Sequence, residues 1–445
     1  MLYQMREVQR AVLTPLSDWA ESMSKLCANP YSPLAYVPFS NRVSAGFELL
    51  HRLGKEYEKP EFGLKTTTIG ENVVTVAERI EISKPFCRLV KFERLLPKSL
   101  ADRHDDPTVL VVAPLSGHHA TLLRDTVRAL LPDHNVYITD WIDGRMVPMV
   151  HGAFHLDDYV AYCIEFMRAL GPDVHVISVC QPTVPVLAAV SIMATMKDAH
   201  RPLSMTMMGG PIDTRHSPTE VNNLATNHTF GWFERNVIHT VPIKYPGAGR
   251  RVYPGFLQHA GFVAMNPDRH MTSHWDYYLD LVRGDLDDAE DHRKFYDEYN
   301  AVLDLPAEYY LDTIHTVFQE HLLPRGQWHV TFEGERIRVA PENITDVALF
   351  TIEGELDDIS GSGQTQAAHR LCENIPQAHQ RHLTAEGAGH YGIFSGRRWR
   401  EYICPQVREF IHGHRRRTPG QVAAAAGRAA PRARRCPRDR PAGSG

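Results

Sequence analysis

The sequence lacks the features that would place the protein in a membrane or outside the cell. No apolar run approaches the ~18 residues that a membrane-spanning helix needs. The first ten residues, MLYQMREVQR, carry Arg6, Glu7 and Arg10 where a signal peptide would have its apolar core, so we expect no export by that route. The seven cysteines are odd in number and show no Cys-x-x-Cys spacing, which argues against a disulfide scaffold and a zinc module. We therefore expect a cytoplasmic protein.

Charge is not distributed evenly along the 445 residues. Residues 415–445 contain nine arginines and one acid, a net charge of +8, whereas the preceding residues carry 39 basic and 52 acidic side chains, a net charge of −13. An acidic body argues against nucleic acid as a partner. The C-terminal segment 415–445 is rich in Ala, Pro and Gly, which predicts a disordered basic tail. A solvated tail is the favoured interpretation, and binding of a polyanion is the alternative.

Residues 1–30 carry apolar side chains spaced three or four apart, the pattern of an amphipathic helix. The apolar positions are Leu2, Met5, Val8, Val12, Leu16, Trp19, Met23 and Leu26. Pro15 predicts a bend or a restart within this helix. Two interpretations stay open: the helix docks on the body of the protein, or it lies on a hydrophobic surface. Residues 1–100 as a whole are interpreted as an N-terminal extension.

From residue 101 the sequence alternates between apolar strands and helices, which predicts a parallel sheet with right-handed crossovers. The expected strands are 109–113, 135–139, 174–179 and 204–208, with helices at 121–131, 157–170 and 183–196. The alternation stops near residue 214 and resumes with a strand at 347–352, a helix at 365–375, a short strand near 382–383 and a helix at 399–411. We therefore predict one α/β domain, residues 101–213 and 345–414, interrupted by a largely helical lid at 214–344.

A candidate nucleophile, Cys180, directly follows the strand 174–179 in the run Ile-Ser-Val-Cys-Gln-Pro. A nucleophile at a sharp strand-to-helix turn is exposed above the sheet, and the residues two before and two after it are usually glycine. Here they are Ser178 and Pro182. A cysteine at a helix N-terminus has its thiolate favoured by the helix dipole. The alternative is a buried structural cysteine, which is common for this residue type.

Two later residues complete a possible catalytic set. Asp357 lies on the loop after the strand 347–352, with its neighbour Asp358 as the second choice, and His390 lies between glycines after the last predicted strand. The order nucleophile, acid, histidine, with each residue after a strand, is that of the α/β-hydrolase arrangement. Cys180 would attack an ester carbonyl, His390 would act as general base, and Asp357 would fix the imidazole tautomer.

The oxyanion formed by such an attack needs two backbone donors. The N–H of Gln181, directly after the nucleophile, is the first candidate. The second is expected from the loop 114–117, where we favour Ser116 over Leu115.

Other candidate sites are weaker, and we expect no metal and no cofactor. The pairs His151/His155 and His270/His274 have metal-binding spacing but no obvious third ligand, and His118-His119 lies in the predicted oxyanion loop. Gly209-Gly210 follows a strand without a Gly-x-Gly-x-x-Gly pattern, so a dinucleotide site is not supported. The lid contains aromatic residues that either shape an apolar groove or pack the lid itself: Phe230, Trp232, Phe233, Tyr253, Phe256, Phe262 and Tyr278.

Long stretches of residues 1–414 resemble the intracellular polyhydroxybutyrate depolymerases. The resemblance is carried by VVAPLSGHHATLLRDTVRALL, VYITDWIDGRMVP, VHVISVCQPTVPVLAA, MTMMGGPIDTR, RRVYPGFLQHAGFVAMNPDRH, FYDEYNAVLDLPAEYYLDTI, EGELDDISGSGQT and GHYGIFSGRRWR. It implies an α/β-hydrolase fold, a cysteine nucleophile, and hydrolysis of amorphous poly(3-hydroxybutyrate) in cytoplasmic storage granules to oligomers and monomer. Cys180, Asp357 and His390 match the family's catalytic motifs. The tail after His414 lies outside the resemblance.

The expected partner is the granule surface, and the oligomeric state is left open. An uncharged polyester exerts no long-range electrostatic attraction, so binding must come from apolar contact, through the N-terminal helix or the aromatic lid. The alternatives are a polyhydroxyalkanoate synthase-type acyltransferase, thiolysis with coenzyme A as acceptor, another esterase or thioesterase, and a non-catalytic granule-coat protein. A synthase resembles Gly-x-Cys-x-Gly-Gly at its elbow, which differs from the run Ser-Val-Cys-Gln-Pro found here.

Overall fold

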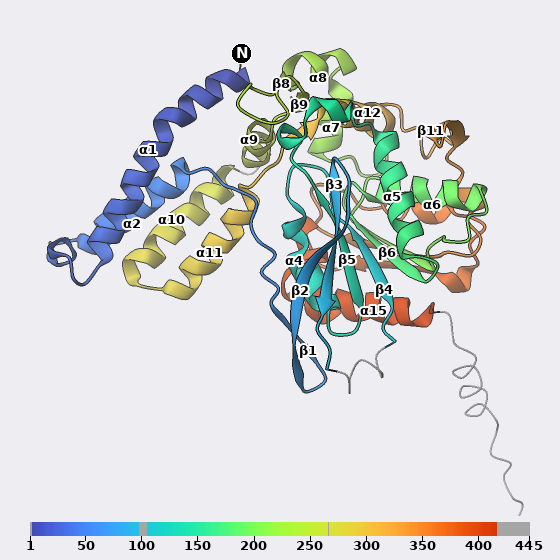
Figure 1. Ribbon diagram of the computed structural model, residues 1–445, viewed down its shortest axis with the longest axis horizontal. Helices are drawn as coiled ribbons and strands as arrows, with labels where there is room; N and C mark the ends of the chain where they lie inside the picture. The colour runs from blue at the N-terminus through green and yellow to red at the C-terminus, as the bar shows by residue number, and fades with distance from the viewer. Residues whose placement is uncertain (1, 98–104, 266, 416–445) are drawn as a thin grey trace, which may run out of the picture.

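The computed structural model describes residues 2–97, 105–265 and 267–415, and a nine-stranded sheet lies at the centre of these residues (Figure 1). The strand order is β1-β2-β3-β5-β4-β6-β7-β13-β14. β1, β2 and β3 pair antiparallel, and β3 pairs antiparallel with β5; all later pairs are parallel. The strands are β1 (Thr66–Ile69), β2 (Asn72–Ser83), β3 (Cys87–Arg94), β4 (Thr108–Val112), β5 (Asn135–Trp141), β6 (Val174–Val179), β7 (Ser204–Met208), β13 (Ala348–Gly354) and β14 (Gln380–Ala385).

The parallel strands are buried because helices cover both faces of the sheet. Every residue of β6, β7 and β13 is buried. α4 contacts α15, and α5 contacts α6; Figure 1 shows α4 and α5 on either side of the strands. The helices are α4 (Arg124–Leu130), α5 (Leu156–Leu170), α6 (Thr183–Thr195), α13 (Ala368–Leu371) and α15 (Cys404–Gly413). This architecture confirms the predicted α/β-hydrolase fold. The helix expected at 365–375 is shorter, since the loop before it is tied to the sheet.

The sheet extends further towards the N-terminus than the boundary predicted at residue 101. β3 pairs with β5 from Cys87↔Trp141 to Phe92↔Val136, so residues 66–94 form one edge of the sheet rather than a separate extension. No helix separates β1, β2 and β3 along the chain. Antiparallel neighbours need only short turns, so the strand–helix alternation that located the other strands was absent.

The chain between β7 and β13 forms helices and two small sheets above the main sheet. The helices are α7 (Glu220–Asn227), α8 (Phe230–Asn236), α9 (Gly255–Met265), α10 (Pro267–Arg283), α11 (Leu286–Tyr299) and α12 (Ala307–Thr313). One small sheet has the order β10-β9-β8, from Leu305–Pro306, Arg251–Tyr253 and His239–Thr240. The other pairs β11 (His329–Phe332) with β12 (Glu335–Arg338).

An arm of two helices, α1 (Leu2–Ala28) and α2 (Ser40–Gly54), extends from the body beside α10 and α11 (Figure 1). α1 runs through Pro15 without a break in its assigned range. No helix of the described ranges combines the length and apolarity needed to cross a bilayer. Of the predicted tail 415–445, residues 416–445 lie outside the described residues.

Candidate active site

Cys180 occupies the turn between β6 and α6. Its φ is 67°, in the left-handed region that a non-glycine residue rarely adopts, and its N–H donates to the carbonyl oxygen of Met208 on β7 at 2.7 Å. A strained residue at this strand-to-helix turn is typical of a nucleophile elbow, where the strain aims the side chain away from the sheet. Cys180 is half-buried, whereas the other five cysteines of the described residues are buried. The structure thus places the predicted nucleophile where a substrate can reach it.

Asp357 and His390 lie side by side at the same edge of the sheet. The His390 Nδ1–H donates to Asp357 Oδ2 at 2.7 Å, and both side chains are buried. The other carboxylate oxygen, Oδ1, accepts the backbone N–H groups of Ile359 and Ser360 at 2.9 and 2.8 Å. These bonds fix the carboxylate so that one oxygen faces the imidazole. Asp358, the second choice from the sequence, is exposed.

The electrostatic surroundings of His390 join it to Cys180. Burial alone would lower the pKa of the imidazole, but Cys180 and Asp357, through their charges and their hydrogen bonds, raise the pKa of His390 well above its usual value. A hydrogen bond joins Asp357 to His390, and the nearby Cys180 contributes to the raised pKa of the imidazole. The assignment of Cys180, Asp357 and His390 as a catalytic set stays a prediction.

Gly209, at the end of β7, leaves the space that the Asp357 and His390 side chains occupy, because it has no side chain of its own. Its φ is +56°, and a Cβ there would lie 3.3 Å from Asp357 Oδ2 and 3.3 Å from His390 Cε1. At the next position, Gly210, a Cβ would collide with Thr183. The sequence drew attention to these glycines only as a weak dinucleotide motif. Their position after a buried strand, next to the strand that carries the nucleophile, was the available signal.

Both predicted oxyanion donors are free of backbone partners. The N–H groups of Ser116 and Gln181 donate no hydrogen bond within the described residues. The loop at 114–117 packs closely against α9. Gly117 of this loop has φ +114°, and a Cβ there would lie 2.8 Å from Gln258 Oε1 and 3.2 Å from Phe262. The N–H of Leu115 is equally free, so the choice between Ser116 and Leu115 stays a prediction.

The two histidines of this loop are buried and neutral. His118 stacks on Phe262 of α9, and its Nε2–H donates to the carbonyl oxygen of Tyr299 at 3.2 Å. Burial lowers the pKa of His118 to about 4 and that of His119 to about 3. His118 therefore connects the loop at 114–119 to α9 and α11.

Two of the other histidines that the sequence singled out, His155 and His270, have polar side-chain partners. His155 Nδ1 lies 2.8 Å from Asp312 Oδ2, and His270 Nδ1 lies 2.9 Å from the Tyr296 hydroxyl. A separate group with possible metal ligands, found among the described residues, comprises Asp133, His134 and His412. Arg408 Nε donates to that carboxylate at 2.8 Å, and this neighbouring cation disfavours a metal ion.

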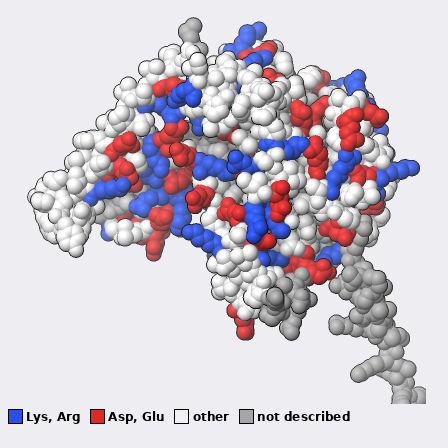
Figure 2. All heavy atoms as spheres, in the orientation of Figure 1, with Lys and Arg blue, Asp and Glu red and all other residues white. Residues whose placement is uncertain are grey.

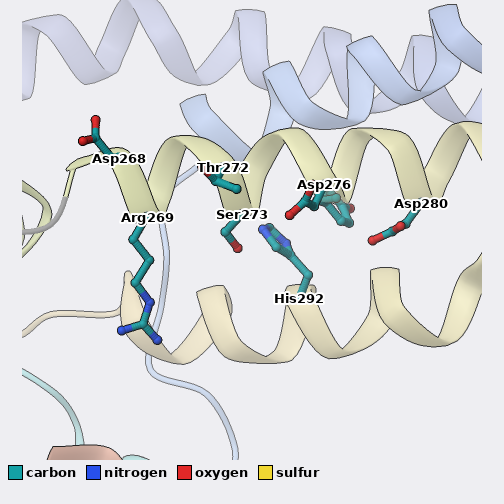
Figure 3. A pocket seen from close by; sticks show the side chains of 8 residues that line it. Asp268, Arg269, Thr272, Ser273, Asp276, Asp280 and His292 are labelled. Atoms are coloured by element: carbon teal, nitrogen blue, oxygen red, sulfur yellow. The ribbon is translucent and has the colours of Figure 1, made fainter. Parts of the chain in front are cut away.

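Cavities lie on the side of the arm and the helices α9–α11. One of about 540 Å³ lies between α10 and α11, where Ser273 and Asp276 of α10 lie opposite His292 of α11 (Figure 3). A larger cavity of about 1460 Å³ is bounded by α1, α2, α9 and α10. Neither is lined by Cys180, Asp357 or His390, so the catalytic candidates do not belong to these cavities.

The comparisons with known proteins bear on residues from the end of β7 onward. Residues 209–415 match the family described as PHB de-polymerase C-terminus. The matched segment covers slightly less than half of the chain. It contains Asp357 and His390 but begins after Cys180. The similarity to this family and the α/β-hydrolase fold together support ester hydrolysis as the general reaction.

Solved structures with a similar fold include several hydrolases. The monoacylglycerol lipase of Paleococcus ferrophilus shares 13% identity, with 70% of this chain and 97% of that chain covered and a TM-score of 0.41. A thermophilic esterase from Thermogutta terrifontis shares 13% identity, with 79% and 98% covered and a TM-score of 0.39. The 2-hydroxy-6-oxo-6-phenylhexa-2,4-dienoate hydrolase of Rhodococcus sp. strain RHA1 shares 11%, with 76% and 99% covered and a TM-score of 0.41. Comparison with curated proteins gave no match.

Proposed function

We propose that the protein hydrolyses poly(3-hydroxybutyrate) through an acyl-enzyme on Cys180. The observation that carries this proposal is the buried His390–Asp357 pair, whose imidazole has its pKa raised by both Cys180 and the carboxylate despite the opposing effect of burial. A cysteine beside a protonated histidine is a nucleophile that needs no metal or cofactor. The depolymerase family of residues 209–415 supports the polyester as substrate.

In the first half of the reaction the Cys180 thiolate attacks an ester carbonyl carbon of the polymer. The negative charge on the carbonyl oxygen is stabilised by the N–H groups of Gln181 and Ser116, each worth roughly 3 kcal/mol. The C–O bond then breaks, His390 donates its Nε2 proton to the leaving alkoxide, and the shortened chain departs with a free hydroxyl. A thioester on Cys180 remains.

In the second half, water replaces the thiolate. Neutral His390 accepts a proton from the water, the hydroxide attacks the thioester carbonyl, and the C–S bond breaks to release a carboxylic acid. The protonated imidazole pairs again with the thiolate. Asp357 holds Nδ1–H throughout, so the tautomer with Nε2 facing the thiol is the one maintained.

Residues 214–344 act in this proposal as a lid over the nucleophile. α9 contacts the oxyanion loop through the Phe262–His118 stack, with ring centroids 5.0 Å apart. Tyr309 of α12 is buried, and its burial and the nearby Cys180 raise its pKa well above the usual value. The lid thus reaches both the donors and the nucleophile.

Product analysis on amorphous granules, with and without coenzyme A, tests this function. Hydrolysis predicts 3-hydroxybutyrate and its oligomers in both samples, and loss of release in Cys180→Ala. Hydroxybutyryl-coenzyme A as the main product would show thiolysis instead. Consumption of hydroxybutyryl-coenzyme A with growth of polymer would show a synthase. Release by Cys180→Ala at the wild-type rate would refute the mechanism.

A further inference from the structure

The apolar side of α1 faces solvent over the length of the helix. Val8 and Val12 are 68% and 70% exposed, and Met5, Leu16, Trp19 and Leu26 are exposed as well. These residues, which we call the α1 stripe, repeat at intervals of three, four or seven, so they lie on one face. A helix of 27 residues is about 40 Å long. An exposed apolar surface of this length is unusual on a soluble protein and marks an interaction site.

The stripe is exposed because α1 uses a different face to pack on α2. The residues of α1 that are buried are small or polar, among them Ser17, Ala20 and Ser24. The contact is close: a Cβ at Gly54 of α2 would lie 3.3 Å from the Ser17 Cβ, and the Ser17 hydroxyl donates to the His51 carbonyl oxygen at 3.0 Å. Small residues form much of this contact, and of the stripe only Trp19 has a ring contact with α2, edge to face with Phe47 at 5.2 Å among the described residues, so the other large apolar residues remain outside.

The turn that joins α1 to α2 continues this surface with aromatic side chains. Tyr31 is 95% exposed and Phe39 71%, and Tyr36 and Val37 are also exposed. Residues 28–41 contain no charged side chain. Figure 2 shows this outer end of the arm as largely white, whereas Lys, Arg, Asp and Glu gather where the arm meets the body.

The charges of the arm are already engaged within the protein. Arg10 pairs with Glu7 at 3.2 Å, Lys25 with Glu21 at 2.6 Å, and Arg52 and Lys55 with Asp297 at 2.8 and 3.1 Å. The two remaining basic residues of the arm, Arg6 and Arg42, lie over the rings of Phe256 and Phe39. An anionic lipid surface attracts an excess of basic residues, whereas residues 2–54 carry five basic and four acidic side chains.

The aromatic residues of the lid, the other candidate surface, contact one another or their neighbours. Phe262 stacks on His118, Trp232 stacks on His228, and Phe256 meets Tyr3 edge to face with ring centroids 5.5 Å apart. These rings pack within the protein, whereas Phe230 and Trp275 of the lid are exposed; the arm presents the longer continuous apolar surface among the described residues.

We propose that the α1 stripe and the aromatic turn adsorb the protein to amorphous polyester. The surface is apolar and aromatic and belongs to an arm of nearly balanced charge, which matches an uncharged polymer better than an anionic membrane. This inference rests on the proposed function for its substrate, and it places substrate capture on an arm separate from the Cys180 site.

Adsorption is measured on full-length Cys180→Ala protein, so that binding is read apart from hydrolysis. Three further changes are compared in this background: Val8→Ser/Val12→Ser on the stripe, Tyr31→Ser/Phe39→Ser in the turn, and Val150→Ser/Ile243→Ser as a control at sites off the arm that are 86% and 94% exposed. Serine and valine have similar helix propensities, and circular dichroism verifies folding. Each protein is pelleted with surfactant-free amorphous poly(3-hydroxybutyrate) particles or with phosphatidylglycerol-containing vesicles.

The stripe and turn variants should each bind the polymer about tenfold more weakly than the control variant, because each loses two exposed apolar side chains. Equal pelleting of all three would overturn the inference. Vesicle binding as tight as polymer binding would reassign the surface to lipid, and a dimer that the arm variants dissociate would reassign it to a second copy of the chain. Polymer hydrolysis by the Cys180→Ala protein would refute the proposed mechanism while leaving the adsorption result intact.

Discussion

Replacing Asp357 with asparagine removes the charge from the buried pair while preserving its shape. The asparagine Oδ1 keeps its two backbone donors, so the amide N–H₂ must occupy the place of Oδ2 and face His390. An N–H₂ there cannot accept from Nδ1–H, which forces the imidazole into the other tautomer, with Nε2 protonated before it meets the thiol. The wrong tautomer cannot take up the thiol proton, and in a comparable triad this costs up to about 5 kcal/mol of transition-state stabilisation, or about 10⁴ in kcat. Since each ~1.4 kcal/mol is a tenfold change in rate, we expect release of 3-hydroxybutyrate from amorphous polymer to fall about 10²- to 10⁴-fold.

The matched control for this variant is Asp358→Asn. Asp358 is the next residue, is exposed, and makes no hydrogen bond to His390 within the described residues. Its substitution should leave the rate within about threefold of wild type, in keeping with the small effects of exposed charges. Circular dichroism verifies that both variants fold. A full rate in Asp357→Asn, or an equal loss in Asp358→Asn, would refute the assignment of Asp357.

Three other results are expected. Gly209→Ala should lower turnover about 10- to 100-fold, because its Cβ would lie 3.3 Å from Asp357 Oδ2 and from His390 Cε1; unchanged turnover would contradict this close approach. Iodoacetamide should label Cys180 before the buried cysteines of the described residues, as read by peptide mass spectrometry, and prior labelling of a buried one would contradict it. Burial and the neighbouring Asp143 raise the pKa of Asp304 from 3.8 to about 7, so the folded protein retains a proton that the unfolded chain has lost. Asp304 alone therefore lowers the free energy of unfolding as pH rises from about 4 to 7, so Asp304→Asn should lack this contribution when its pH dependence is compared with that of wild type; identical pH dependence of the two proteins would contradict it.

Much of the parallel sheet was predictable because each of its strands is a continuous apolar run beside a helix. The runs at 174–179 and 204–208 match β6 and β7 residue for residue. The antiparallel edge was harder, since β2 and β3 are only partly buried and their pairing depends on contacts with β5, far along the chain. The sequence alone also did not show that the α1 stripe faces solvent, because periodicity identifies an apolar face but not whether another element covers it.

The candidate site shows the same division between local and long-range information. The order of Cys180, Asp357 and His390 along the chain, each after a strand, predicted that they share one edge of the sheet. What the sequence left open was which of two adjacent aspartates faces the histidine, and the structure decides in favour of Asp357 because Ile359 and Ser360 turn their N–H groups towards it. Gly209 was unrecognised because its importance comes from side chains more than a hundred residues away.

The covalent intermediate provides the most direct test of the central claim. The enzyme is mixed with a short soluble 3-hydroxybutyrate oligomer, quenched in acid during turnover, digested and analysed by peptide mass spectrometry. The account predicts a 3-hydroxybutyryl thioester on the peptide that contains Cys180, present in wild type and absent in Cys180→Ala. Turnover without any adduct on Cys180, or with the adduct on another residue, would contradict it.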